Sequence, residues 1–303
     1  MGIFKKSGVI VLNKPKPGAC GGTTATLDTN APKEIKSTDM TVFEVTSVLP
    51  YMRDVPDAVG YISAFAANSG DGTFLFFETR EGHRRDLRRA GWTYIKENVM
   101  PELVALTREC NLAANNGFHS KTHGLPENFG GEIDIRYAGG ERISVSNNQQ
   151  SIISYDTGLR IKEFFESAEK KEKTVLPDVS SLLSVLYEEK GRGNAYKNIT
   201  LTLNGDGTGT IKKICRYDGE PTVFESEETI DRETVDKIKN TAKEKGVFAW
   251  AGLPDGSYSF SYDKRLTFIF RDADSISVKG GKFIPDRLRG GFFDIELELT
   301  RTH

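Results

Sequence analysis

The chain contains 303 residues, of which 37% are apolar and 28% are charged, and it carries a formal net charge of −2. This composition is typical of a soluble globular protein, and the small net charge excludes a bulk attraction to nucleic acid or to an anionic membrane. No apolar run approaches the roughly 20 residues that a membrane-spanning helix requires.

The N-terminal segment, residues 1–38, is rich in Lys, Pro, Gly and Thr and lacks any sustained periodicity. It therefore predicts a flexible leader. Its apolar patch, residues 8–12, falls short of the roughly 7–15 residues of a signal-peptide core, so export is not favoured. The three cysteines, Cys20, Cys110 and Cys215, are widely spaced and form no C-x-x-C pair. This pattern indicates a reducing cytoplasm rather than a disulfide framework.

Residues 39–172 predict a first α+β region, in which apolar alternation indicates strands and a 3.6-residue period indicates helices. Pro101 suits the first turn of one helix, where Leu103 and Leu106 share a face. The indicated elements are, in chain order, strands at 41–49, 60–68, 72–80 and 91–98, a helix at 100–110, a hairpin at 132–146, and a closing helix at 156–171 with Asp156 as its cap.

Residues 173–303 repeat the same order of elements. The tripeptide Gly-Leu-Pro occurs at 124–126 and again at 252–254. The hairpin that follows each copy ends in Ile-Ser-Val, at 143–145 and at 276–278. A helix over 231–246, with Asp231 as cap and Gly246 as stop, matches the first helix of the first region. Landmarks that keep their order at a nearly fixed spacing predict an internal duplication.

The expected fold is therefore α+β: two tandem copies of an antiparallel sheet with a packed helix and a terminal hairpin, preceded by the leader. The C-terminal segment, residues 290–303, is ambiguous, because its local alternation favours a strand whereas the duplication favours a helix. We expect the helix. The two repeats could pack to leave a groove between them.

Two histidines, His119 and His123, lie in the polar stretch "FHSKTH", which predicts a loop. A close pair of histidines is a common metal-binding pattern, but a loop does not hold both rings on one face, and the second repeat has no histidine there. Solvated loop histidines are the favoured interpretation, and we expect neither a metal nor a cofactor. No Ser or Cys stands beside a plausible His, and no G-x-S-x-G motif occurs.

A cluster of arginines between two predicted strands is the densest charge feature of the sequence. Guanidinium groups suit phosphate oxygens, so the cluster predicts a phosphate or RNA contact. The alternative is a solvated hairpin tip that protects a strand end from aggregation. The corresponding stretch of the second repeat, residues 216–221, is not basic. The five arginines are Arg80, Arg84, Arg85, Arg88 and Arg89.

The segment 115–149 resembles a family of functionally uncharacterised bacterial proteins. The residues that carry the resemblance are Asn116-Gly117, Gly124-Leu125-Pro126, Tyr137, Gly140-Glu141 and Ser146-Asn147-Asn148-Gln149. The resemblance implies no known activity. The second repeat departs from it, since Lys279-Gly280-Gly281 stands in place of the Asn-Asn-Gln run.

This difference between the repeats points to a ligand site in the first one. Polar residues at the ends of a hairpin could face a ligand or partner, although Asn and Ser also favour such positions as turn and cap residues. The candidates are Tyr137, Arg142, Asn147, Asn148 and Gln149.

We therefore expect a non-catalytic, cytoplasmic binding or protein-interaction protein. Its partner is expected to be a protein or a small molecule rather than a nucleic acid or a membrane. Two alternatives remain open: a hydrolase-like enzyme with its site in a groove between the repeats, and phosphate or RNA binding through the cluster Arg80–Arg89.

Overall fold

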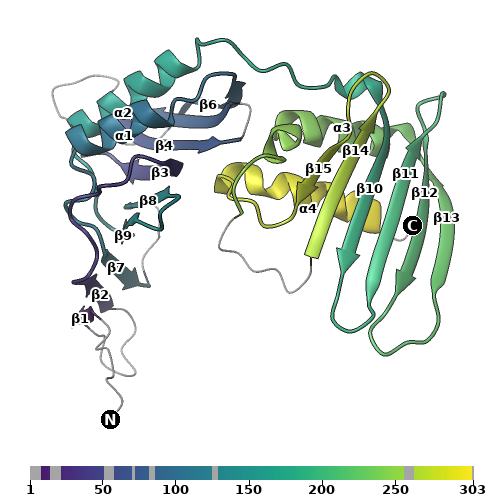
Figure 1. The fold of residues 1–303 in the computed structure, drawn as a ribbon, viewed down its shortest axis with the longest axis horizontal. Coiled ribbons are helices and arrows are strands. Elements are labelled where there is room, and N and C mark those ends of the chain that lie inside the picture. The colour runs from purple at the N-terminus through teal and green to yellow at the C-terminus, as the bar shows by residue number, and fades with distance from the viewer. Residues whose placement is uncertain are drawn as a thin grey trace. The chain divides into compact units, whose positions relative to one another are not determined.

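The computed structural model describes residues 8–13, 22–50, 58–69, 72–81, 86–124, 129–255 and 263–301. The chain divides into two compact units, Met1–Lys173 and Thr174–His303, a boundary within one residue of the expected one. Each unit combines helices with a largely antiparallel sheet, so the α+β class is confirmed (Figure 1). The units are described one at a time.

The first unit is built on a nine-stranded sheet with the order β1-β2-β7-β9-β8-β3-β4-β5-β6. Neighbouring strands pair antiparallel except for β7 and β9, which pair parallel. The strands are β1 (Val9–Asn13), β2 (Gly22–Asp28), β3 (Met40–Val48), β4 (Val59–Asn68), β5 (Thr73–Glu81), β6 (Asp86–Ile95), β7 (Phe118–His123), β8 (Gly131–Tyr137) and β9 (Arg142–Asn147).

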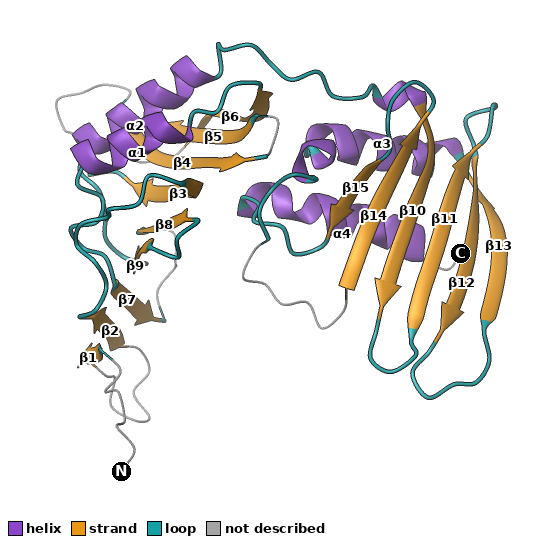
Figure 2. Cartoon of the chain, viewed as in Figure 1, coloured by secondary structure: helices purple, strands orange, loops and turns teal. Residues whose placement is uncertain are grey.

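Two helices, α1 (Met100–Glu109) and α2 (Tyr155–Ala168), cover one face of this sheet (Figure 2). The ring of Phe165 on α2 lies 5.3 Å from the ring of Phe77 on β5 and 6.1 Å from that of Phe43 on β3. Burial of such aromatic and aliphatic side chains is the main force that holds helix to sheet. The cap of α2 is Ser154, whose hydroxyl accepts from the N–H of Thr157, rather than the expected Asp156.

The C-terminal end of α1 is closed by a Schellman motif, which explains a sharp change of chain direction. The N–H of Leu112 donates to the carbonyl of Thr107 at 3.1 Å, and the N–H of Asn111 donates to that of Arg108 at 3.0 Å. Asn111 takes φ +50°, and no other non-glycine residue among those described has a positive φ. Asparagine tolerates this left-handed conformation better than most residues.

The second unit has a six-stranded antiparallel sheet with the order β13-β12-β11-β10-β14-β15. Two helices, α3 (Arg232–Glu244) and α4 (Asp286–Thr300), pack on it and on each other. Asp231 caps α3 as expected, since its carboxylate accepts from the N–H of Thr234. The strands are β10 (Leu182–Lys190), β11 (Tyr196–Leu203), β12 (Gly209–Arg216), β13 (Phe224–Ile230), β14 (Asp263–Phe270) and β15 (Ile276–Lys279); two short 3-10 helices are η1 (Val179–Ser181) and η2 (Val247–Trp250).

The two units have the same arrangement of six strands. In the second unit β15-β14-β10-β11-β12-β13 lie side by side, and in the first unit β9-β8-β3-β4-β5-β6 follow the same chain order. In both, one helix follows the fourth of these strands and another follows the sixth. The first unit adds β1, β2 and β7 to this common arrangement.

Three segments that the sequence left without a definite element form regular structure. The leader, residues 1–38, was expected to be flexible, but it contributes two strands, β1 and β2. Strand β2 forms ladder hydrogen bonds with β1 on one side and with β7 on the other. The expected loop "FHSKTH" is strand β7, because backbone pairing on both sides fixes it without any apolar alternation. The ambiguous C-terminal segment forms α4.

The tight contact between Gly130 and the end of β9 gives a first prediction. A Cβ atom at Gly130 would lie 1.6 Å from the carbonyl oxygen of Asn147, a backbone atom that cannot move aside. We expect Gly130→Ala to lower the free energy of unfolding by about 1–3 kcal/mol or more. Gly91→Ala is the control, because a Cβ there meets nothing within 4 Å. Urea denaturation of both variants measures the difference, and equal stability would contradict the contact.

Candidate functional site

The five predicted ligand residues lie at opposite ends of the β8–β9 hairpin. Arg142 pairs with Arg136 next to the turn, whereas Asn147 pairs with Gly131 at the far end. Arg142 and Asn147 are five residues apart along the extended strand, which is about 17 Å. The structure therefore does not bring Tyr137 and Arg142 together with the Asn-Asn-Gln run.

The Asn-Asn-Gln run forms local structure. The side-chain oxygen of Asn147 accepts from the N–H of Gln149 at 2.9 Å, a turn that ends β9. The side-chain amide of Asn148 makes two hydrogen bonds with the backbone of Thr122, at 2.8 and 2.9 Å. These contacts continue the pairing between β9 and β7, so the two asparagines have a structural role.

Tyr137 belongs to the core beneath the turn. Its side chain is buried, and this burial raises the pKa of its hydroxyl to about 12. Arg108 acts in the opposite direction, because its positive charge lowers the pKa of the nearby Tyr137. Tyr137 thus lies close to the C-terminal end of α1, where the pocket described below is found.

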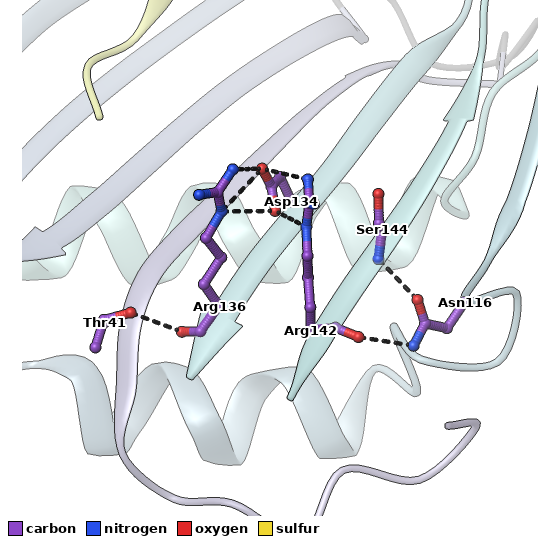
Figure 3. A network of polar contacts seen from close by, with 6 residues as sticks. All are labelled: Thr41, Asn116, Asp134, Arg136, Arg142 and Ser144. Carbon is purple, nitrogen blue, oxygen red and sulfur yellow. Dashed lines mark hydrogen bonds and ion pairs between the residues drawn. The ribbon is translucent and has the colours of Figure 1, made fainter. Parts of the chain in front are cut away.

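Arg142 takes part in an ion-pair network on the sheet face opposite the helices (Figure 3). Asp134, only 4% exposed, accepts two hydrogen bonds from Arg142, at 2.7 and 2.9 Å. Arg136 donates to the same carboxylate from its own strand, at 2.8 and 3.2 Å. One buried carboxylate thus compensates two guanidinium groups, and the shared pairing orients both arginine side chains.

Asn116 connects this network to the N-terminal segment. Its side-chain oxygen accepts from the N–H of Ser144, and its amide nitrogen donates to the carbonyls of Arg142 and Pro32 (Figure 3). Its own carbonyl accepts from the ammonium of Lys33. Asn116 is 2% exposed, and each of its polar groups named here has a partner, which is the usual condition for a buried amide. It fixes the segment around Lys33 beside β9.

A pocket lies between that segment and the C-terminal end of α1; we call it the α1 pocket. Its volume is about 510 Å³, within the range of small-molecule sites. Residues 33–36 form one wall, and the end of α1 with the Schellman turn forms the other. The lining residues are Lys33, Glu34, Ile35, Lys36, Thr107, Arg108, Asn111 and Ala113.

Thr107 adds a buried polar side chain to the lining of this pocket. The residue is 2% exposed, and its hydroxyl has no hydrogen-bond partner within the described part of the chain. Buried hydroxyl groups are normally satisfied, so an orphan on a pocket wall needs an explanation. The sequence carries a weak signal for the burial of Thr107. The residue follows Leu103 by four positions and therefore occupies a core position of an amphipathic helix.

Cationic side chains surround the same pocket. Arg108 donates from Nη2 to the carbonyls of Lys36 and Ser37, at 3.2 and 3.3 Å, which fixes the wall opposite α1. Glu141 accepts from the N–H of Ser37 at 2.7 Å, and hydrogen bonds from Ser37 lower the pKa of this carboxyl. Sequence reasoning missed this site because its walls are more than 70 positions apart in the chain.

His119 and Ser146 form a contact that the sequence did not indicate. Nδ1 of His119 lies 2.9 Å from the hydroxyl oxygen of Ser146, brought together by the parallel pairing of β7 with β9. Burial, assisted by the charge of Arg142, lowers the pKa of His119. His123 instead contacts Thr24 at 3.4 Å. Nowhere in the described part of the chain do three or more metal-binding side chains gather.

The predicted arginine cluster is only partly within the described residues. Arg80 donates to buried Glu78 at 2.7 Å and lies over the ring of Tyr61. Arg89 pairs with Glu169, which caps the C-terminal end of α2 on the other face of the sheet. These two arginines therefore serve separate ion pairs on opposite faces. Arg84 and Arg85 lie outside the described residues, as does the side chain of Arg88.

The second unit holds two carboxylates, one buried and one half-buried, around one tyrosine. The hydroxyl of Tyr187 lies 2.8 Å from Glu189 and 2.9 Å from Glu296 on α4. Lys197 contacts Glu189 at 3.1 Å and Lys264 contacts Glu296 at 2.6 Å. Burial and these carboxylates raise the pKa of Tyr187 above its usual range. Because each carboxylate has a lysine partner, the cluster fastens α4 to the sheet.

Comparison of the sequence with models of known protein families gave no match, and neither did a search of curated proteins. Among the described helices, none is both long enough and apolar enough to cross a bilayer. The functional conclusion therefore rests on the residues and contacts of the chain itself.

The Asp134 network gives a prediction for stability. Asp134→Asn removes the charge that compensates Arg136 and Arg142, which keep about a fifth and about half of their side chains exposed. Because solvent screens these partners in part, we expect a loss of about 1–3 kcal/mol in the free energy of unfolding. Asp236→Asn, at an exposed position of α3, is the control and should cost below about 0.5 kcal/mol. Equal urea midpoints for the two variants would show that the network is not stabilising.

The lowered pKa of His119 predicts a dependence of stability on pH. The ordinary value is 6.5, and the folded value lies below it, so the unfolded chain binds more protons between the two. The contribution of His119 is therefore complete above pH 6.5 and is lost as the pH falls toward the folded pKa. NMR titration of the His119 ring should give a midpoint below 6.5, and His119→Asn should remove this part of the pH dependence. A midpoint above 6.5 would contradict the burial of the His119 ring.

Proposed function

We propose that the protein is a non-catalytic binding protein whose first unit holds a small molecule in the α1 pocket. The observation that carries the proposal is Thr107, a residue of the pocket lining whose buried hydroxyl has no hydrogen-bond partner in the described part of the chain. A ligand with a polar group would satisfy it. The volume of about 510 Å³ suits a small molecule.

We also propose that the two units arose by duplication of one ancestral unit. The support is the common order of six strands and two helices, with the same neighbours in each sheet. The wall formed by residues 33–36 lies in the part that only the first unit has, between β2 and β3. On this view the first unit acquired its pocket after the duplication, and the second kept the common arrangement.

The cytoplasmic location and the bacterial family remain part of the proposal. Cys110 and Cys215 are free thiols, and burial raises the pKa of both, which fits structural cysteines in a reducing compartment. The hydrolase-like and RNA-binding alternatives remain predictions. The separate ion pairs of Arg80 and Arg89 give the RNA alternative no support from those two residues.

Ligand-observed NMR with a diverse set of small fragments tests the binding function on the full chain. We expect some fragments to bind wild type and to lose binding in Thr107→Val, which removes the hydroxyl but keeps the shape. Thr241→Val, the same change on α3 of the second unit, is the control and should leave these fragments bound. If every fragment that binds wild type also binds Thr107→Val with equal affinity, the α1 pocket is not the ligand site.

A further inference from the structure

We infer that the ligand of the α1 pocket carries an anionic oxygen group, a carboxylate or a phosphate, held by the cations of the pocket and by the hydroxyl of Thr107. The inference rests on the proposed binding function and names the chemical class of its ligand. It is carried by three observations: the charge of the lining, the donors that the lining offers, and the unpartnered hydroxyl.

The charge of the lining is positive although the chain as a whole is slightly acidic. Lys33, Lys36 and Arg108 face a single lining carboxylate, that of Glu34. None of the three cations forms an ion pair with a described residue. The formal net charge of the chain is −2, so this local excess does not follow from bulk composition. A concave site lined by one sign of charge concentrates ligands of the opposite sign.

The lining also offers hydrogen-bond donors in excess of its internal needs. Lys33 donates to the carbonyl of Asn116, and Arg108 uses one nitrogen for two backbone carbonyls. An ammonium group carries three donors and a guanidinium five, so several N–H groups remain for a ligand. The side chain of Lys36 makes no hydrogen bond to a described residue. Its ammonium group can therefore turn toward a ligand more readily than the side chains of Lys33 and Arg108.

A cationic ligand is the competing possibility, because the pocket lies at the C-terminal end of a helix. The helix dipole places roughly half a negative charge there. However, the carbonyls of Thr107 and Arg108 already accept from Leu112 and Asn111, which leaves few acceptors for a cation. Three positive side chains still exceed the negative charges, which are half a charge from the helix, the lining carboxylate of Glu34 and the carboxylate of Glu141 beside the wall at Ser37. The balance therefore favours an anion.

Thr107 belongs to the same lining, and its buried hydroxyl, which has no described partner, would complete the site as a short, neutral donor. It sits on the buried wall, whereas Lys33, Lys36 and Arg108 are all exposed. An anionic oxygen placed between them would receive one hydrogen bond from the wall and charge-assisted bonds from the rim. Carboxylate and phosphate share this chemistry, and the experiment below distinguishes them.

Titration of the full-length chain by ¹⁵N NMR at constant ionic strength tests the inference. The probes are inorganic phosphate and acetate, with chloride as the baseline anion and tetramethylammonium as the cation. We expect phosphate or acetate to shift the amide signals of residues 33–36 and 107–113 in a saturable way, and chloride and tetramethylammonium to leave them unchanged. Saturation with phosphate alone identifies a phosphate ligand, and saturation with acetate alone identifies a carboxylate.

Variants separate a specific site from general surface charge. Lys36→Gln and Thr107→Val should each weaken binding of the active anion about tenfold, the effect of one lost charge-assisted or buried hydrogen bond. Lys170→Gln, the same loss of charge at an exposed lysine of the first unit, should leave the affinity unchanged. Equal weakening by Lys170→Gln would overturn the inference, as would shifts that chloride reproduces.

The outcome also distinguishes this inference from the proposed function. If neutral fragments bind in a Thr107-dependent way while both anions fail, the pocket is a binding site for a neutral ligand and the anion inference is wrong. If neither fragments nor anions depend on Thr107, both the inference and the proposed function fail.

Discussion

The hydrogen bonds of Asn116 are the interaction on which the site in the first unit depends. This one buried side chain holds β9 on one side and the segment at Pro32 on the other, through three bonds of 2.7 to 2.9 Å. Without it the segment at Pro32 would lose its side-chain link to β9, and this wall of the α1 pocket would be held farther along, by the bonds of Arg108 and Glu141. A buried amide that hydrogen-bonds to the backbone of separate chain segments cannot be replaced without a loss of stability, because any apolar substitute leaves those backbone groups unpaired.

The two units show how such a site can be added to a common arrangement. Six strands and two helices recur in both, and in the first unit the N-terminal segment adds Ile35 to the buried core. The added strands β1, β2 and β7 extend the sheet of the first unit beyond β9, and the chain between β2 and β3 then crosses to the end of α1. A pocket between an addition and a stable core can diverge in sequence at little cost to the fold.

The sequence predicted the elements whose signals are local, and missed those fixed by distant partners. Asp231 and Gly246 marked the ends of α3 correctly, because caps depend on neighbouring residues. Strand β7 has no apolar alternation and exists through pairing with β2 and β9, so no pattern indicated it. The predicted ligand set failed to gather because Tyr137 and Asn147 lie at opposite ends of one hairpin. Lys33 and Thr107 are distant in the sequence, and only the fold brings both to the lining of the α1 pocket.

The energetics of Thr107 give the strongest argument that this pocket has a function. A buried hydroxyl without a partner costs about 1–3 kcal/mol, and valine would fill the same space without that cost. Every neighbouring core position of α1 is apolar, among them Leu103, Val104 and Leu106, so the helix does not need a polar residue there. A ligand that accepts from the hydroxyl would offset the cost in the bound state alone. On the proposed function, recognition of a ligand therefore accounts for threonine at this position.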